Sequence, residues 1–336
     1  MKTYTDISSA DYFSHIYIEK EAYEYPVTSR ILDRFRNSVR IEINHYKDVF
    51  NRGHQDYAVQ KSVPSLILAV KHGELIYPGA KVCQSFNNHY FYYTSNIMNC
   101  IYDCEYCYLQ GMYPSGNIVV FVNLEDIFAD VEKLLAVHPV YLCISYDTDM
   151  LAMEAVTGFV SRWCEFGALH PCLTIEIRTK SAYSGGFGHF PVSSNIIFAW
   201  TLSPDAIISS YEHRTPSLDA RLQCLKKASD LGYTVRLCFD PMIYVKEYRK
   251  IYSEFYRKVF EVIPADAVLD ISLGLFRISA SYIKAMQNRR INSITAYPYT
   301  NTDGVCSYDE NSSREMLDFA RAELSQYISQ DKIFCI

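Results

Sequence analysis

The feature that most constrains the fold is a regular alternation of short apolar runs with amphipathic helical segments after residue 107. Strands are predicted at 118–121, 140–145, 173–178, 196–202, 234–239 and 268–275, and helices at 124–135, 151–166, 217–231 and 248–262. Strands separated by helices of this length predict βαβ units and a mostly parallel sheet. No Gly-rich nucleotide fingerprint opens the first helix, so the repeats favour a partial or full (β/α) barrel over a doubly wound sheet.

The chain of 336 residues is longer than a single core usually supports, which predicts one large domain with appendages or two domains. Residues 1–92 mix strand and helix patterns and are interpreted as a small α/β appendage. Residues 93–285 hold the barrel repeats, and residues 286–336 form a C-terminal extension with a turn-rich hairpin near 297–308 and a helix near 312–328. The predicted class is thus α/β, a partial (β/α)6 barrel with two additions.

Charge and hydropathy exclude several classes of protein. The net charge of −6 argues against a partner held by nonspecific electrostatics, and nucleic-acid binding proteins usually show a basic footprint. No run of about 18 apolar residues predicts a membrane span, and the polar N-terminus lacks the order of a signal peptide. We therefore expect a soluble, cytoplasmic protein without a membrane partner, in which the 11 cysteines are reduced.

Three of the cysteines are concentrated in the run Cys100-Ile-Tyr-Asp-Cys104-Glu-Tyr-Cys107. Three thiolates at this spacing can bind three irons of a [4Fe–4S] cube and leave the fourth iron open for chemistry. A structural zinc site requires four closed ligands, and the nearest additional candidates, His89 and Cys83, lie eleven or more residues upstream. The run therefore predicts an iron–sulfur cluster.

The spacing Cys-x3-Cys-x2-Cys, followed by the aromatic Tyr108, resembles the cluster loop of the radical S-adenosylmethionine superfamily. The resemblance implies a barrel of radical SAM type, in which the open iron binds S-adenosylmethionine and reductive cleavage yields a 5′-deoxyadenosyl radical. In such enzymes the cofactor carries the radical chemistry, and the protein supplies the binding site and orientation.

A closer resemblance extends over about 250 residues. The segments concerned are 104–110, 119–127, 146–149, 178–180, 198–203 and 211–222, with an opening block at 17–26. In order and approximate spacing they are similar to the spore photoproduct lyase family, DNA-repair enzymes of sporulating bacteria. This resemblance implies a carbon–carbon lyase that reverts 5-thyminyl-5,6-dihydrothymine in ultraviolet-damaged double-stranded DNA to two thymines. It also implies a reductant such as flavodoxin or ferredoxin; we further expect a monomer, located in the spore core where the organism sporulates.

The resemblance assigns roles to individual residues. Cys100, Cys104 and Cys107 are the expected cluster ligands. The expected contacts to S-adenosylmethionine are Lys180, Thr201 and Ser203, because an ammonium can pair with a carboxylate and a hydroxyl can hydrogen-bond it. Substrate contacts are expected at the end of a barrel strand, from Tyr146, Thr148 and Asp149.

This chain differs from one branch of the family in the residue expected to donate a hydrogen atom to the repaired base. Bacillus-type members carry a cysteine at the place that Tyr146 occupies here, whereas clostridial members resemble this chain at Cys83, upstream of the cluster. Cys83 is therefore the predicted donor, with Cys143 and then Tyr146 as alternatives. Tyr106 and Tyr108 resemble tyrosines that relay the radical or contact the lesion.

A second departure concerns DNA. The family's C-terminal hairpin carries an Arg-Tyr wedge, but the hairpin region here has tyrosines and no matching arginine. Enzymes that act on a base extrude it and commonly fill the gap with aromatic groups, so Tyr299 or Tyr308 is the predicted wedge. Arg289-Arg290 and Lys226-Lys227 are candidates for phosphate contacts. A radical SAM enzyme acting on a nucleotide, RNA or peptide is the alternative, and an iron–sulfur redox or sensor protein is a third hypothesis.

Overall fold

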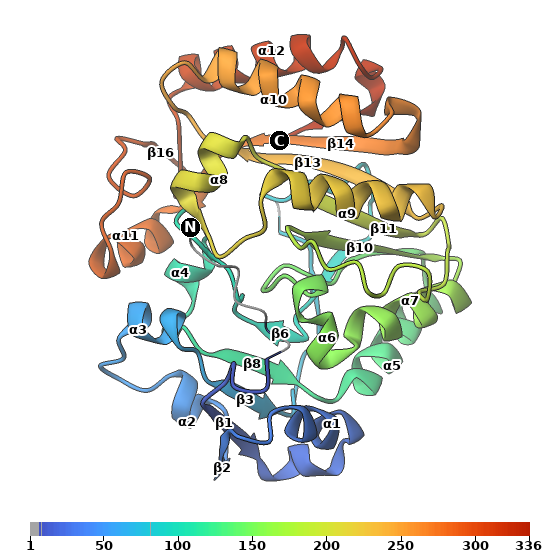
Figure 1. The fold of residues 1–336 in the computed structure, drawn as a ribbon, viewed down its shortest axis with the longest axis vertical. Coiled ribbons are helices and arrows are strands. Elements are labelled where there is room, and N and C mark those ends of the chain that lie inside the picture. The colour runs from blue at the N-terminus through green and yellow to red at the C-terminus, as the bar shows by residue number, and fades with distance from the viewer. Residues whose placement is uncertain (1–6, 8, 81) are drawn as a thin grey trace.

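The computed structural model describes residues 7, 9–80 and 82–336 and shows an α/β protein with two main sheets (Figure 1). The larger sheet contains, in order, β18 (Ile333–Cys335), β14 (Val268–Leu275), β13 (Thr234–Met242), β11 (Ile196–Thr201), β10 (Leu173–Thr179), β9 (Val140–Cys143), β5 (Phe91–Thr94) and β4 (Ile76–Pro78). The smaller contains β2 (Val39–Ile43), β1 (His15–Glu19), β3 (Leu66–Ala69), β8 (Ile118–Phe121) and β6 (Ile97–Met98). Within these two sheets, as far as the described residues go, only the pairs β4–β5 and β6–β8 are antiparallel, which confirms a mostly parallel α/β fold.

The segment 91–98 links the two sheets. Its first half, β5, pairs with β9 of the larger sheet, and its second half, β6, pairs with β8 of the smaller sheet. The predicted strand 118–121 forms with the expected bounds as β8. It pairs with the N-terminal strand β3 and not with β9, the next strand of the predicted βαβ pattern. Strands before residue 92 contribute to both sheets, and the division at residue 92 stays a prediction.

Helices cover the sheets and match the predicted amphipathic segments closely. In the described chain they are α1 (Pro26–Arg34), α2 (Lys47–Phe50), α3 (Tyr57–Ser62), α4 (Leu109–Met112), α5 (Leu124–Leu135), α6 (Glu154–Thr157), α7 (Phe159–Leu169), α8 (Asp205–Tyr211), α9 (Leu218–Asp230), α10 (Tyr248–Val262), α11 (Ala280–Arg289) and α12 (Glu310–Leu324), with 3-10 turns η1 (Lys20–Glu24), η2 (Leu151–Met153), η3 (Ala265–Ala267) and η4 (Gln330–Lys332). The helix predicted over 151–166 is instead divided into η2, α6 and α7. Gly158 separates the last two with φ of +65°, a left-handed conformation that ends a helix and that glycine adopts without strain.

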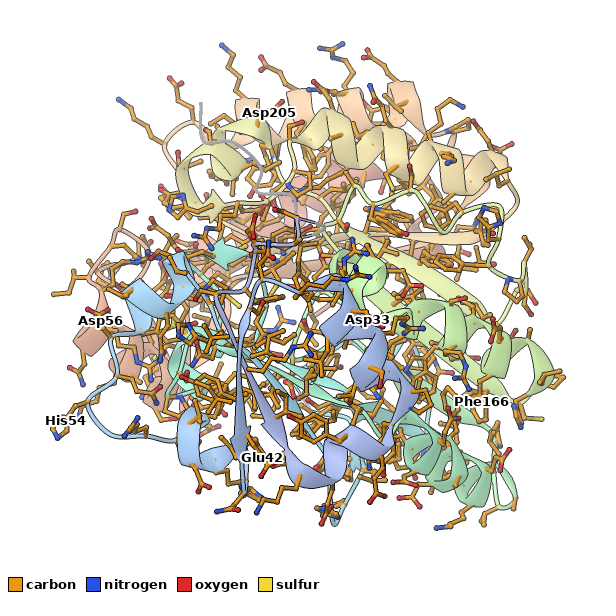
Figure 2. All side chains as sticks on the ribbon, turned by 60° about the horizontal axis from the view of Figure 1, so that its bottom comes forward. Asp33, Glu42, His54, Asp56, Phe166 and Asp205 are labelled. Carbon is orange, nitrogen blue, oxygen red and sulfur yellow. The ribbon has the colours of Figure 1, made fainter. Side chains whose placement is uncertain are left out.

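One continuous core joins the two sheets and their helices. It includes side chains from β1, β3 and β8 as well as from β9, β10, β11, β13 and β14, and the strands β8, β9 and β11 are buried along their whole length. Figure 1 shows α10 and α12 above β14, and α1 beside the smaller sheet at the opposite end. Charged side chains such as Glu42 and Asp205 lie at the surface (Figure 2). Among the described helices none is long and apolar enough to span a membrane.

The C-terminal extension contains the predicted hairpin and helix. The hairpin consists of β16 (Thr300–Thr302) and β17 (Val305–Ser307), and β15 (Arg277–Ser279) pairs with β17 on its other edge. The preceding helix α11 packs against α4, the short helix that follows the three cysteines. The extension is therefore in contact with the region that carries the predicted chemistry.

Candidate active site

The predicted site residues lie at the C-terminal ends of neighbouring parallel strands. Cys143 ends β9, Thr179 ends β10 and Thr201 ends β11. Asp149 and Lys180 follow in the loops after β9 and β10. Because the strands are parallel, these loops meet at one edge of the sheet, which is the edge where barrel enzymes carry their reacting groups.

The three clustered cysteines lie in a loop held from several sides. Within the loop, the backbone N–H of Cys107 donates to the carbonyl oxygen of Cys104 at 3.0 Å, and the side-chain amide of Gln110 donates to the same oxygen at 2.5 Å. From α3, the buried ammonium of Lys61 donates to the carbonyl oxygen of Cys100. The positions of the three thiols are thus set by the fold.

Two further segments fasten this loop. The short strand β12 (Glu212–His213) pairs antiparallel with β7 (Asp103–Cys104), and the N–H of Glu105 donates to the carbonyl oxygen of Tyr211 at 2.8 Å. From α11, Arg289 donates to the carbonyl oxygen of Gln110, and Arg290 forms an ion pair with Asp103 at 3.3 Å. The Arg289-Arg290 pair, predicted as a phosphate contact, therefore braces the cysteine loop instead.

The surroundings of the thiols favour their protonated form. Burial raises the pKa of Cys100 to about 11, raises the pKa of Cys104 well above its ordinary value, and also raises that of Cys107. The ammonium groups of Lys61 and Lys180 act in the opposite direction. A bound metal must therefore displace protons from these thiols, and the nearby ammonium groups favour the thiolates that result.

The donor set fits an iron–sulfur cube rather than a single ion. In the part of the chain that the structure describes, no three His, Cys, Asp or Glu side chains are gathered so as to hold one metal ion. In a [4Fe–4S] cube, however, each thiolate binds a different iron, so the sulfurs do not need to meet at one point. Three cysteines on one braced loop satisfy that requirement and leave one iron without a protein ligand.

The carboxylate of Glu212 is the buried centre of the polar site. It accepts hydrogen bonds from the hydroxyl of Ser203 at 2.9 Å and from that of Tyr106, and it forms an ion pair with the fully buried guanidinium of Arg221. Burial alone would raise the pKa of Glu212, but the charges of Arg221 and then Lys180 lower it to about 2. Tyr106 and Ser203 are thus both held by a carboxylate that stays ionised.

Sequence reasoning assigned no role to Glu212 or Arg221. Both lie in the segment 211–222 that carries the family resemblance, nine residues apart. A buried charge that has lost its partner is costly, so an acid and a base confined to the same buried region of a fold must pair. No local pattern in this segment marks which of its acidic and basic residues are buried, and only the fold identifies this pair.

Asp149 positions Lys180. Its carboxylate accepts from the backbone N–H of Lys180 at 2.6 Å, from the hydroxyl of Thr179 at 2.7 Å and from the N–H of Ala152 at 3.0 Å. The ammonium of Lys180 lies 5.5 Å from the ring centre of Tyr106. The Asp149 carboxylate, predicted as a substrate contact, is therefore engaged by the protein itself, whereas the half-buried ammonium of Lys180 faces the cysteine loop.

Two threonines complete this part of the site. The side chain of Thr201 is buried, and its carbonyl oxygen accepts from Arg221 at 3.2 Å. The hydroxyl of Thr148 is also buried, and it has no hydrogen-bond partner among the described residues. A buried hydroxyl without a partner is costly unless a ligand satisfies it, so Thr148 is the hydroxyl of this group most available to one.

The three candidate hydrogen-atom donors converge. The hydroxyl of Tyr146 shares side-chain hydrogen bonds with both Cys83 and Cys143, although the three residues come from two separate loops and the end of β9. The ring of Tyr146 stacks on Tyr93 with 5.1 Å between ring centres. Its carbonyl oxygen accepts from the hydroxyl of Tyr108 at 2.6 Å. Because Tyr108 directly follows Cys107, the donor candidates lie next to the cysteine loop.

A network of partly buried charges lies next to this cluster. Arg178 donates to Glu176 at 3.1 Å and approaches Asp240 at 3.7 Å. Arg277, at the start of β15, donates to Asp240 at 2.9 Å and to the carbonyl oxygen of Val82 at 3.0 Å. The residue that precedes Cys83 is thus held by the C-terminal part of the chain, nearly two hundred residues away.

The two tyrosines predicted as a DNA wedge face other protein groups. Tyr308 is buried, and its hydroxyl oxygen accepts a hydrogen bond from the backbone N–H of Tyr244 at 2.8 Å. Tyr299 is partly buried against Phe276, with 5.1 Å between ring centres. The structure therefore places neither ring at a free hairpin tip, and the wedge role stays a prediction that this packing does not favour.

Comparison with known proteins identifies the family. The family model described as Spore photoproduct lyase matches residues 12–331. The spore photoproduct lyase of Bacillus subtilis is 23% identical over 273 residues, covering 78% of this chain and 77% of that protein. The spore photoproduct lyase of Clostridium acetobutylicum is 21% identical over 338 residues, covering 96% of this chain and 98% of that protein. The chain belongs to the spore photoproduct lyase family.

Solved structures of spore photoproduct lyase share the fold. A single mutant superposes with a TM-score of 0.82 at 20% identity, covering 96% of this chain and 98% of that chain. A double mutant with bound AdoMet and dinucleoside spore photoproduct superposes with a TM-score of 0.80 at 20% identity, with the same coverage. The likeness confirms the predicted fold class, a radical SAM partial barrel.

The cysteine assignment predicts the outcome of reconstitution. Cys100→Ala should fail to retain iron and sulfide after anaerobic reconstitution, because the cube would lose one of its three protein ligands. Iron content and the visible absorption of the cluster are the measurements. The exposed Cys172 provides the matched control, and Cys172→Ala should retain iron as the unmodified protein does. Equal iron in both variants would remove Cys100 from the ligand set.

The Glu212–Arg221 pair predicts a pH-dependent loss of stability. Glu212→Gln should lower the free energy of unfolding at pH 7 by about 3 kcal/mol, because it leaves the buried Arg221 without a counter-charge. Because the folded protein lowers the pKa of Glu212 from its ordinary value to about 2, the stability contributed by the pair is full above about pH 5 and is lost as the pH falls toward 2. The difference in the free energy of unfolding between Glu212→Gln and the unmodified protein should therefore shrink over that pH range, as measured by urea titrations.

The exposed Glu254 of α10 is the control for this substitution. Glu254→Gln should change the free energy of unfolding by no more than about 0.5 kcal/mol at either pH. A pH-independent difference between Glu212→Gln and the unmodified protein would contradict the ion-pair assignment.

Proposed function

We propose that this protein is a DNA-repair lyase that reverts spore photoproduct in ultraviolet-damaged DNA to two thymines. Membership of the spore photoproduct lyase family over nearly the whole chain supports this activity. The observation that carries the proposal is the convergence of Cys83, Tyr146 and Cys143 beside the loop of three cysteines. Such an arrangement provides a hydrogen-atom donor next to a site for radical generation.

The cofactor site follows from the same geometry. Cys100, Cys104 and Cys107 would hold a [4Fe–4S] cluster, and Lys180 would pair with the carboxylate of S-adenosylmethionine, with Thr201 and Ser203 close by. When bound, this pair of cofactors supplies a 5′-deoxyadenosyl radical by one-electron reductive cleavage. The ion-paired carboxylate of Glu212 fixes the hydroxyls of Tyr106 and Ser203 by accepting their hydrogen bonds. The carboxylate of Asp149 fixes the backbone of Lys180 by accepting its N–H.

Cys83 is the proposed hydrogen-atom donor. A thiol can give up a hydrogen atom only while it is protonated, and burial raises the pKa of Cys83. Its S–H bond would break homolytically, the hydrogen atom would pass to the carbon radical of the opened thymine, and a thiyl radical would stay on Cys83. Cys143 also has a raised pKa, but it is almost completely buried and its thiol lies 3.7 Å from a carboxylate oxygen of Glu176. The half-buried Cys83 is the more accessible of the two.

Tyr146 and Tyr108 extend the path from Cys83 toward the cysteine loop. The hydroxyl of Tyr146 is hydrogen-bonded to Cys83, so its O–H bond can break to return a hydrogen atom to the thiyl radical, which re-forms the S–H bond and leaves a tyrosyl radical on Tyr146. Tyr108, with 37% of its surface exposed, donates to the carbonyl oxygen of Tyr146. In this proposal Tyr108 contributes both to the alignment of Tyr146 and to the wall of the substrate site.

The proposal extends to partners and location. A one-electron donor such as flavodoxin or ferredoxin would reduce the cluster, and lesion-containing double-stranded DNA would be the substrate. We propose a monomer that acts in the cytoplasm, or in the spore core where the organism sporulates.

A single assay tests the activity. Anaerobically reconstituted protein, S-adenosylmethionine and dithionite are incubated with and without the dinucleoside spore photoproduct, and thymidine and 5′-deoxyadenosine are measured. Formation of thymidine that depends on the lesion is the expected result. Formation of 5′-deoxyadenosine without repair would assign the protein to another substrate, and the absence of both products would indicate a redox or sensor protein.

The donor assignment makes a separate prediction. Cys83→Ala should retain a full cluster and still consume the lesion, but it should divert much of the product from thymine to adducts of formate or sulfite, because the carbon radical lacks its donor. Product analysis by mass spectrometry gives the ratio. Cys143→Ala is the matched control and should leave thymine as the main product. A normal thymine yield from Cys83→Ala would show that another group donates the hydrogen atom.

A further inference from the structure

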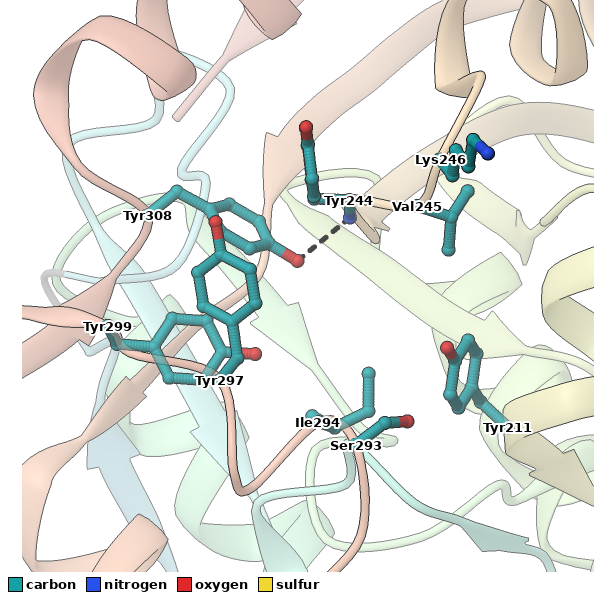
Figure 3. Close-up of a pocket in the computed structure, with 9 residues that line it drawn as sticks. All are labelled: Tyr211, Tyr244, Val245, Lys246, Ser293, Ile294, Tyr297, Tyr299 and Tyr308. Atoms are coloured by element: carbon teal, nitrogen blue, oxygen red, sulfur yellow. Dashed lines mark hydrogen bonds between the residues drawn. The ribbon is translucent and has the colours of Figure 1, made fainter.

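A pocket lined by tyrosines lies between the end of β13 and the C-terminal extension (Figure 3). Its volume is about 330 Å³. The lining residues come from α8, the loop after β13, the loop after α11 and the hairpin, and they are Tyr211, Tyr244, Val245, Lys246, Ser293, Ile294, Tyr297, Tyr299 and Tyr308. Flat aromatic walls with several hydroxyls and one ammonium in a pocket of this size are typical of sites that bind a small planar ligand.

One wall of the pocket is a packed cluster of rings. Tyr297 lies 4.9 Å from Tyr299 and 5.1 Å from Tyr308 between ring centres, and Tyr299 lies 5.5 Å from Tyr308. The hydroxyl of Tyr308 accepts from the backbone N–H of Tyr244 at 2.8 Å, which joins the hairpin to the loop after β13. The tyrosines that face solvent, above all Tyr244 with 41% of its surface exposed, are therefore mounted on a rigid support.

The opposite wall is connected to the cysteine loop. Figure 3 shows Tyr211 across the pocket from Tyr297, Tyr299 and Tyr308, with Lys246 near the upper rim. The carbonyl oxygen of Tyr211 accepts from the N–H of Glu105, which lies between two of the cluster cysteines. The pocket also opens beyond the C-terminal end of β13, the same edge of the sheet that carries the candidate active site. A ligand that reaches both places would extend from the active site into this pocket.

We propose that this pocket binds an unpaired nucleobase of the DNA strand next to the lesion, an inference that rests on the proposed function. Every nucleobase has a π-face that stacks on tyrosine, and the exposed ammonium of Lys246 can pair with the adjoining phosphate. The hydroxyl of Ser293 offers a hydrogen bond to a base edge. Extrusion of a base leaves a gap in the duplex, and this gap stays open while the displaced base is bound in the pocket. The tyrosines therefore act as a receptor for a displaced base rather than as an inserted wedge.

This assignment accounts for two features of the chain at once. The hairpin lacks the arginine of the family wedge, and its tyrosines face inward to form the pocket wall. Stacking is largely independent of net charge, so an aromatic receptor can hold a nucleotide on a protein with a net charge of −6.

The test uses the reconstituted protein without reductant and an undamaged DNA duplex that carries one unpaired 2-aminopurine. Stacking quenches the fluorescence of this base, so binding and quenching are read together, with a fully paired duplex for comparison. The unmodified protein should prefer the unpaired site and quench it. Tyr244→Ala and Tyr297→Ala should each weaken binding by about 10-fold and restore the fluorescence. Lys246→Ala should reduce the slope of binding affinity against salt concentration by about 1, which corresponds to the loss of one phosphate contact.

The controls separate stacking from folding. Tyr244→Phe keeps the ring and should bind as the unmodified protein does, and Tyr23→Ala removes an exposed tyrosine outside the pocket and should have no effect. Absence of quenching by the unmodified protein, or unchanged affinity in both Tyr244→Ala and Tyr297→Ala, would overturn the pocket. Because this measurement needs no turnover, repair of the dinucleoside without quenching would reject the pocket alone. Quenching without repair would instead reject the proposed function and leave the pocket standing.

Discussion

The buried ion pair between Glu212 and Arg221 is the interaction on which the candidate active site depends. Glu212 lies on the short strand that pairs with the cysteine loop, and Arg221 lies on the helix α9. Neither charge is accessible to water, so each requires the other, and their separation would leave an uncompensated charge in the core. The pair therefore holds the cysteine loop against the barrel, and it holds Tyr106 and Ser203 with it.

A second set of charges organises the hydrogen-atom donors. Arg277 and Arg178 share Asp240, and Arg178 also reaches Glu176, whose carboxylate lies beside Cys143. These links connect β9, β10, β13 and β15. Arg277 also donates a hydrogen bond to the carbonyl oxygen of Val82 and so holds the loop of Cys83. The candidate donors are thus placed by charged residues on several strands, which is why the two cysteines and Tyr146 come together although no short motif contains all three.

Much of the fold was predictable from local patterns. The bounds of β8, β14, α5 and α10 follow directly from hydrophobic periodicity, because each of these elements buries one face or its whole length. The helix predicted over 151–166 is interrupted in the structure, since the pattern does not register the left-handed backbone at Gly158. The pairing of β8 with β3 was missed for a different reason: periodicity indicates that a strand is buried, but it does not say which strand is its neighbour.

The sequence by itself determined the run of three cysteines that we predict as cluster ligands, the parallel α/β class and the small group of residues proposed as hydrogen-atom donors. These depend on spacing and on periodic burial, which act over a few residues and are visible in one dimension. Only the tertiary structure decided that Arg289 and Arg290 brace the cysteine loop, that Asp149 is engaged by Lys180, and that the C-terminal tyrosines line a pocket. Those outcomes depend on which charges and rings are buried together, and long-range packing sets that arrangement.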